Sequence, residues 1–288
     1  MSILVIGATG TVGGAVARLL SARGIPARAL LRSQGKAGSL PAGVTAVPGD
    51  LQRPGTLPAA FAGAESVFLV NFQAEDETAQ GLAGVAAAVA AGARRIVYLS
   101  VGMPEGCEII PHFASKMPIE DAVRGSGLAH VILRPNNFYQ NDGWFRPAIV
   151  DAGLYPQPIG SIGLSRVDVG DIAECAVRAL LGEAGDAETL ELVGPEVLNG
   201  EATAAAWQRH LGRPVRYAGD NLDAWAAGAR TMLPERLVHD FGIMYRYFQE
   251  RGWAAPPGAV ERLMAVLGRP PRSFDDYVAR TAAEWRAG

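Results

Sequence analysis

The chain has 288 residues, of which 49% are hydrophobic and 19% are charged, and this composition excludes a disordered or collagen-like protein. Its 26 basic and 29 acidic residues give a formal net charge of -3, and no basic run could neutralise several phosphates. Nucleic acid is therefore not an expected partner. The length predicts one large domain, or a domain with a smaller appendage.

The chain carries no pattern that would direct it to a membrane or cross-link it. No segment reaches the roughly 18 consecutive apolar residues that span a bilayer, and the first residues lack the pattern of a signal peptide. Cys107 and Cys175 lie far apart, without His or Cys neighbours at the spacing of metal ligands. We expect a cytoplasmic protein with reduced thiols, no membrane partner and no metal.

Short Val/Ile/Leu-rich runs alternate with helical stretches from residue 1 to about residue 195. This alternation is typical of an α/β fold with a doubly wound parallel sheet, the Rossmann architecture. The predicted strands are 3–7, 26–31, 44–47, 66–70, 95–100, 130–133 and 189–193, and the predicted helices are 11–23, 55–62, 77–92, 115–125 and 168–181. Residues 1–195 are thus predicted to form one domain of this architecture.

Beyond residue 195 helical patterns replace the alternation. The predicted helices there are 200–211, 220–231, 235–250, 258–268 and 274–286, and this part holds most of the large aromatic residues. We expect residues 196–288 to form a smaller, mainly helical lobe that binds the substrate. The alternative is that some of its segments, including the terminal helix, pack against the first domain.

The first predicted strand runs into a glycine-rich loop that opens a helix. Glycines let the backbone N–H groups and the helix N-terminus approach a pyrophosphate, and the strand, loop and helix supply the context that such a motif needs. We therefore predict that this loop binds a dinucleotide and that residues 1–195 form an NAD(P)-binding domain. The alternative is a loop that is only a structural tight turn. The candidate cofactor contacts in this loop are Gly7, Thr9, Gly10, Thr11 and Val12, with a further glycine at Gly13.

The end of the second predicted strand indicates which dinucleotide is bound. NAD-preferring folds of this type carry an acidic residue there to hold the ribose diol, whereas an Arg suits a 2′-phosphate. This strand is followed by Arg32, and no Asp or Glu occurs before Asp50. We therefore expect NADP(H) to be preferred over NAD(H), with Arg32 as the main contact; the alternative is that Arg32 is a solvated surface cation.

Several short segments in a fixed order resemble one known family. They are GATGTVGG at 7–14, RALLR at 28–32, GDL at 49–51, VFLVN at 67–71, VYLS at 97–100, SGL at 126–128, LRPNNFYQN at 133–141 and LGRPPRSF at 267–274. With these segments the chain resembles the NmrA-like branch of the atypical short-chain dehydrogenase/reductase superfamily over nearly its whole length.

The resemblance implies further cofactor contacts. It places Asp50 and Leu51 near the adenine, Asn71 and Phe72 near the adenine ribose, and Ser100 and Val101 on the nicotinamide side, with Asn136, Asn137 and Phe138 closing over the nicotinamide. Four of these residues also fall at the carboxyl ends of predicted strands, the edge where open α/β sheets bind ligands. Taken singly, each could instead be a turn or cap residue.

The chain departs from the superfamily at the catalytic pair. Short-chain dehydrogenases usually carry a Tyr four residues before a Lys, but here His112 precedes Lys116 at that spacing. Lys116 could hold the nicotinamide ribose or be a surface lysine, and His112 could supply a proton or bind substrate. Pro118, however, favours a helix that starts near Met117, which would leave His112 in the preceding loop and break the alignment.

The loss of the Tyr shifts the expected substrate toward electron-poor acceptors, because a quinone that receives hydride forms a stabilised anion that water can protonate. An aromatic cluster could wall a pocket for a flat ring, although ordinary packing explains each member equally well. The candidate substrate contacts are His112, Asn137, Trp144, Tyr245 and Phe248, with Trp225, Tyr247 and Trp253 in the same cluster. Asp168 and Asp171 precede an apolar helix, so a cap is favoured over an acid/base pair.

Three functions remain open from the sequence. The first is an NADPH-dependent reductase that transfers hydride to an aromatic, quinone-like or enone small molecule between the lobes. The second is a non-catalytic NADP(H)-binding regulator that senses redox state and contacts a protein partner. The third, disfavoured by the missing Tyr, is an NADP-dependent epimerase or isomerase. A reductase needs space beside the nicotinamide, which a sensor can fill with its own side chains.

Overall fold

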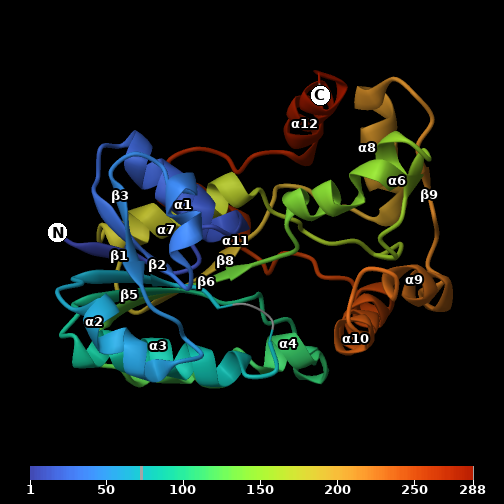
Figure 1. Cartoon of the computed structure of the whole chain (residues 1–288). Helices are drawn as coiled ribbons and strands as arrows, with labels where there is room; N and C mark the ends of the chain where they lie inside the picture. Colours follow the sequence, from blue (N-terminus) through green and yellow to red (C-terminus); the bar gives the residue numbers. More distant parts are fainter. Residues whose placement is uncertain (72–73, 288) are drawn as a thin grey trace.

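A seven-stranded parallel sheet runs through the computed structural model, which describes residues 1–71 and 74–287 (Figure 1). The strand order is β3-β2-β1-β4-β5-β6-β8, and every pair in it is parallel. The strands are β1 (Ile3–Val5), β2 (Ala27–Leu31), β3 (Val44–Pro48), β4 (Ser66–Leu69), β5 (Arg95–Leu99), β6 (Ala129–Pro135) and β8 (Glu188–Leu192). The doubly wound fold predicted from the sequence is confirmed.

Helices cover both faces of this sheet, which is why its strands are apolar on both sides. Along β1, Ile3 and Val5 belong to one hydrophobic core and Leu4 to the other. The first core is covered by α1 (Thr11–Ala22), α7 (Val169–Leu180) and α11 (Ala259–Leu267), and the second by α2 (Leu57–Phe61), α3 (Glu77–Ala90) and α5 (Met117–Gly125) (Figure 1). No helix in the described ranges is long and apolar enough to cross a bilayer.

A third hydrophobic core lies beyond the carboxyl ends of the strands and joins segments from before and after residue 195. Its elements are α4 (Pro111–Ala114), α6 (Arg146–Val150), α8 (Gly200–Leu211), α9 (Leu222–Ala229), α10 (Glu235–Arg251) and α12 (Phe274–Ala287), with β7 (Leu154–Tyr155) paired to β9 (Arg216–Tyr217). Short 3-10 turns complete the chain: η1 (Gln34–Ser39), η2 (Pro54–Thr56), η3 (Cys107–Ile109) and η4 (Tyr139–Phe145). The domain boundary at residue 195 stays a prediction.

A fully buried ion pair lies inside the third core. Arg166 Nη2 lies 2.7 Å from Asp142 Oδ1, and neither side chain is exposed to solvent. Asp142 also accepts hydrogen bonds from the indole N–H of Trp207 at 2.9 Å and from the amide of Gln157 at 2.8 Å. Because buried charges are tolerated only with such partners, this pair fixes η4 against α8.

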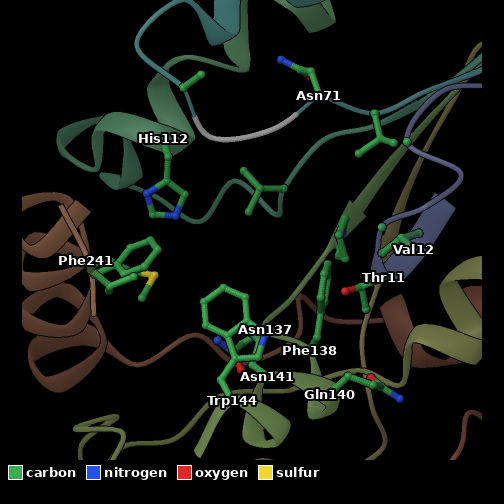
Figure 2. Close-up of a pocket in the computed structure, with 18 of the residues that line it drawn as sticks. Thr11, Val12, Asn71, His112, Asn137, Phe138, Gln140, Asn141, Trp144 and Phe241 are labelled. Atoms are coloured by element: carbon green, nitrogen blue, oxygen red, sulfur yellow. The ribbon is translucent and has the colours of Figure 1, made fainter. Parts of the chain in front are cut away.

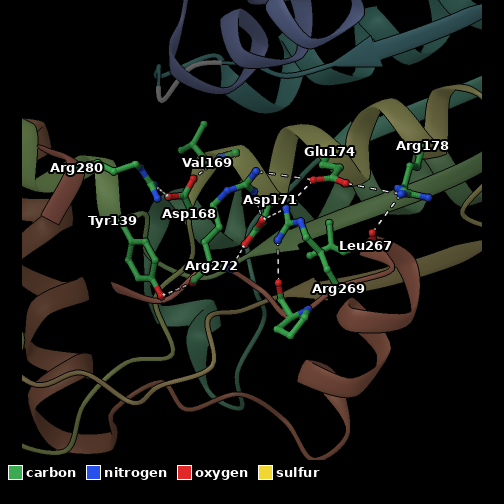
Figure 3. A network of polar contacts seen from close by, with 12 residues as sticks. Tyr139, Asp168, Val169, Asp171, Glu174, Arg178, Leu267, Arg269, Arg272 and Arg280 are labelled. Atoms are coloured by element: carbon green, nitrogen blue, oxygen red, sulfur yellow. Dashed lines mark hydrogen bonds and ion pairs between the residues drawn. The ribbon is translucent and has the colours of Figure 1, made fainter. Parts of the chain in front are cut away.

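Two carboxylates at the start of α7 hold the C-terminal segment against that helix (Figure 3). Asp168 caps α7 by accepting from Gly170 N at 2.6 Å, and it lies 3.2 Å from Arg280. Asp171 accepts from Arg269 at 2.6 Å and from the backbone N–H of Arg272 at 2.7 Å. The cap predicted for Asp168 is confirmed, and Asp171 is an anchor for the C-terminal arginines.

The turn between β1 and α1 depends on a close backbone approach. Gly7 has a φ of +71°, and its carbonyl accepts a hydrogen bond from Gly10 N at 2.8 Å. A Cβ placed on Gly13 would lie 2.3 Å from the Gly7 carbonyl oxygen. Glycine at position 13 therefore lets α1 begin directly against the loop.

We expect Gly13→Ala to lower the free energy of unfolding by about 1–3 kcal/mol, since the added methyl group must push the backbone apart. The matched control is Gly125→Ala at the end of α5, where a Cβ would meet nothing within 4 Å. That control should be neutral or slightly stabilising, because Ala is the better helix former. Urea unfolding of both variants makes the comparison, and equal effects would contradict the role of Gly13.

Candidate functional site

One cavity of about 1400 Å³ extends from the glycine loop, across the carboxyl ends of the strands, to α9 and α10. It is lined by nearly all the candidate residues: Gly7, Thr9, Gly10, Thr11, Val12, Arg32, Asp50, Leu51, Asn71, Ser100, Val101, His112, Lys116, Asn136, Asn137, Phe138, Trp144, Tyr245 and Phe248. Phe72 lies outside the described residues. The structure thus brings the cofactor and substrate candidates into one space, while the role of each stays a prediction.

The glycine-loop end of the cavity is built to receive an anion. The residue before α1 is Gly10, which offers no side chain to cap the helix, and the first turn of α1 contains no acidic residue. The N–H groups at this helix end are therefore left for a ligand, and the helix dipole favours a negative charge there. A pyrophosphate fits this position.

Charge along the cavity also fits a polyanionic dinucleotide. Among the described lining residues the cations are Arg32, Lys36, Arg53 and Lys116, and the only carboxylate is Asp50. That carboxylate is engaged by Arg53 Nε at 3.2 Å and by the backbone N–H of Gln52 at 3.1 Å. Arg32 and Lys36 are exposed, and within the described part of the chain no carboxylate lies within ion-pair distance of either.

Asn71 offers the cavity an unused hydrogen-bond acceptor. The residue is 8% exposed, and its side-chain amide nitrogen donates to the backbone carbonyl of Glu77 at 2.7 Å. The Oδ1 atom has no partner within the described structure. Because buried polar atoms are nearly always paired, this oxygen fits a ligand hydroxyl such as that of a ribose.

Ser100 and Asn136 line the cavity but turn their polar groups into the protein. Ser100 Oγ donates to Glu120 Oε1 at 2.6 Å. The Asn136 amide donates to the Trp253 carbonyl at 2.9 Å, and its oxygen accepts from Asn137 N at 2.8 Å. These hydrogen bonds hold the cavity wall in place. The sequence could not predict that the two polar side chains point into the protein.

His112 lies in the short helix α4, so the prediction that it lies in a loop is wrong. The start of α5 at Met117 was predicted correctly, but the backbone between the two helices stays helical at Ser115 and Lys116. His112 and Lys116 therefore reach the same cavity despite the break. Backbone hydrogen bonds such as that from Ser115 N to the Pro111 carbonyl, at 3.0 Å, bridge the junction.

Each member of this pair is bound by a buried carboxylate. Lys116 Nζ lies 2.6 Å from Glu77 Oε1, on α3. His112 Nδ1 lies 2.6 Å from Asp240 Oδ1, on α10. The two groups are thus fixed in orientation by different helices, one from each side of the cavity.

Aromatic side chains form the wall opposite the strands. The rings of Phe248 and Trp253 stack at 5.6 Å, and Trp225 meets Tyr245 edge-on at 4.9 Å. Tyr247 lies outside the lining, with its hydroxyl donated to the Glu105 carbonyl at 2.7 Å.

The mouth of the cavity also carries aromatic residues. Trp144 is 66% exposed, and Figure 2 shows its ring turned toward the same space as His112 and Phe241. The cavity can therefore hold a flat apolar ring beside the strand ends.

Comparison with known proteins places the chain in a family. A family model described as the NmrA-like family matches residues 1–277. The chain belongs to the NmrA-like family. The resemblance seen in the sequence is thereby confirmed.

Two curated relatives match the NmrA-like chain over nearly its full length. The NAD(P)H azoreductase of Xenophilus azovorans is 34% identical, covering 99% of both chains. The (4-alkanoyl-5-oxo-2,5-dihydrofuran-3-yl)methyl phosphate reductase of Streptomyces griseus subsp. griseus is 33% identical, covering 97% of this chain and 98% of its own. Both named relatives are oxidoreductases, the class predicted for this chain.

A solved structure shares the fold. The NADPH-dependent quinone oxidoreductase of Escherichia coli, complexed with NADPH, is 23% identical and superposes with a TM-score of 0.85, covering 98% of this chain and 99% of its own. The chain therefore shares its fold with a protein whose structure was solved in complex with NADPH.

Other lining residues of the NmrA-like chain escaped the sequence analysis. Phe241 and Met244 join Tyr245 and Phe248 on one face of α10, at the i, i+3, i+4 and i+7 positions of a helix. That spacing was the signal that could have found them. Gln140 carried no such signal, because it lies in the irregular turn η4 and accepts from Val169 N at 2.9 Å. In the described part of the chain no cluster of three potential metal ligands occurs.

The Glu120 carboxylate behind Ser100 predicts how stability depends on pH. Burial raises its pKa, but hydrogen bonds from Arg134 and Ser100 outweigh burial and hold the pKa below the ordinary 4.5. A lowered pKa in the folded state means that ionised Glu120 stabilises the fold above pH 4.5, and that this contribution is lost as the pH falls through the folded-state value.

Glu120→Gln should therefore cost about 1–3 kcal/mol at neutral pH, because two arginines lose a charged acceptor. The difference from the unmodified protein should shrink as the solution is acidified. Urea titrations at neutral and acidic pH test this, with Asp121→Asn as the control, since the neighbouring Asp121 side chain is 78% exposed. A penalty for Glu120→Gln that does not change with pH would refute the assignment.

Proposed function

We propose that this protein is an NADPH-dependent reductase that transfers hydride to an aromatic, quinone-like or enone small molecule. The observation that carries the proposal is the single cavity that joins an anion-binding glycine loop to an aromatic-walled space. Its volume of about 1400 Å³ exceeds the roughly 300–1,000 Å³ of a site for one drug-sized ligand. This favours a site for a cofactor and an acceptor together.

Residues 1–195 would hold the cofactor, and residues 196–288 would supply most of the acceptor side. The glycine loop and the start of α1 would hold the pyrophosphate, and Asn71 Oδ1 would accept from a ribose hydroxyl. When bound, the nicotinamide supplies the hydride. The names of the relatives, an azoreductase and a quinone oxidoreductase, agree with an acceptor that contains conjugated double bonds.

The preference for NADP(H) rests on charge. Arg32 and Lys36 lie at the cavity without a carboxylate partner in the described structure, and Arg53 already offsets Asp50. A 2′-phosphate would find cations here, whereas the ribose diol of NAD(H) would find no unpaired carboxylate.

The chain's own groups orient the reactants and manage protons. Lys116, held by Glu77, would donate a hydrogen bond to the nicotinamide ribose. His112 would face the acceptor and supply a proton where the product needs one. The aromatic wall would exclude water, so that positioning supplies much of the rate enhancement.

The open cavity weighs against the two alternatives. A regulator that only senses NADP(H) has no need for space beside the cofactor, and an epimerase would normally use the missing Tyr. Space lined by Phe241, Met244 and Trp253 therefore favours turnover.

The deciding experiment is NADPH consumption by the purified protein with quinones, aromatic ketones and enones, with NADH in parallel. We expect turnover that prefers NADPH and is lost in Lys116→Ala, because the ribose contact positions the donor. His112→Ala should reduce turnover most for acceptors whose product must be protonated. Tight NADPH binding without turnover of any acceptor would favour the sensor.

Removing the Arg32 side chain should weaken NADPH binding about tenfold to a hundredfold, the worth of one hydrogen bond between charged groups. The dissociation constant for NADH should change less than twofold. Arg23→Ala is the matched control, since Arg23 is an exposed cation that does not line the cavity. Isothermal titration calorimetry measures both ligands, and equal weakening for the two would refute the role of Arg32.

A further inference from the structure

A buried His–Asp pair connects the two sides of the cavity. His112 lies on α4 and Asp240 on α10, 128 residues later in the chain. Their side chains are 9% and 4% exposed, and the distance from Nδ1 to Oδ1 is 2.6 Å. An ionised carboxylate can only accept a hydrogen bond, so Nδ1 carries the proton and donates it to Asp240.

Two aromatic rings fix the plane of this imidazole. Phe113 meets it edge-on at 4.8 Å, and Phe241 meets it edge-on at 5.7 Å. With Nδ1 committed to Asp240, the second ring nitrogen, Nε2, is the one left for a ligand, and His112 lines the cavity (Figure 2). A hydrogen bond from one ring nitrogen thus sets the role of the other.

The remaining side chains of the cavity are poor proton donors. Tyr245 is the only tyrosine among the described lining residues, and burial raises its pKa well above the ordinary value of 10. Its hydroxyl is also directed to Gln157 Oε1, at 3.4 Å. Lys116 is bound to Glu77.

We propose that Asp240 is a positioning residue that makes His112 the proton donor of the reductase. The inference rests on the proposed function and adds to it the source of the proton. Hydride adds to one atom of the acceptor double bond, and the proton on His112 Nε2 is transferred to the other atom. His112 is left neutral, with Nδ1–H still bonded to Asp240, and it takes its next proton from water.

The arrangement also assigns a task to each side of the cavity. His112 comes from the segment that contains Lys116, whereas Asp240 comes from the helix that carries the aromatic wall. The donor is complete only when α10 lies against α4. A chain in which α10 is displaced would keep its cofactor cradle and lose the oriented imidazole.

Turnover of two kinds of acceptor tests the proposal. In Asp240→Asn, which keeps the shape of the side chain, kcat for an enone should fall at least tenfold, because its product must be protonated. For a quinone, whose anionic product water can protonate, kcat should change less than twofold, and KM for NADPH should stay the same. The control Glu235→Gln removes an exposed carboxylate from the first turn of α10 and should alter neither rate.

Equal losses for the two acceptors would overturn the proposal, since they would indicate a general disturbance of α10. So would an unchanged enone rate in Asp240→Asn. If the unmodified protein reduces none of the acceptors, the proposed function fails. The His112–Asp240 pair is then tested by NMR alone.

Nitrogen-15 NMR of labelled histidine shows which ring nitrogen carries the proton, and it needs no turnover. The spectra are recorded at a pH well above the ordinary histidine pKa of about 6.5. We expect the His112 proton on Nδ1 and a bare Nε2 in the unmodified protein. In Asp240→Ala the restriction to this tautomer should be lost. A proton on Nε2 with none on Nδ1 in the unmodified protein, or an identical spectrum in the variant, would overturn the assignment.

Discussion

The backbone contact between Gly13 and Gly7 positions the end of the cavity that the glycine loop lines. A methyl group at Gly13 would clash with the Gly7 carbonyl, so only glycine lets α1 start this close to the loop that follows β1. This start aims the helix N-terminus at the carboxyl edge of the sheet, where β4, β5 and β6 also end. Because parallel strands present their carboxyl ends at one edge, residues from Gly7 to Asn136 gather there.

The opposite side of the cavity comes from a separate core, held by polar contacts between distant segments. The buried Arg166–Asp142 pair fixes η4, and Trp207 and Gln157 complete its hydrogen bonds. A buried pair with every partner satisfied specifies one arrangement of its surroundings. This fixed frame supports α10, and α10 in turn brings Asp240 against His112.

Sequence reasoning found the elements with strong periodicity and missed those set by tertiary contact. The strands, the glycine loop and the five C-terminal helices are long enough to show their pattern. The helix α4 has four residues, about one turn, which is too short to show a helical repeat. Pro118 correctly predicted the start of α5, but it gave no sign of the short helix before it. Asp240 was missed because its partner lies 128 residues away, a pairing that no local pattern records.

The attachment of the C-terminal segment to α7 imposes an order in time on the making of this protein. The arginines that bind Asp171 lie 98 and 101 residues further along the chain. At about 5–20 residues per second, the ribosome adds these residues roughly 5–20 seconds later. Throughout that interval α7 has an unpaired carboxylate at its start, which favours hydration over burial. The contacts that hold the C-terminal segment on α7 therefore form only when translation is nearly finished.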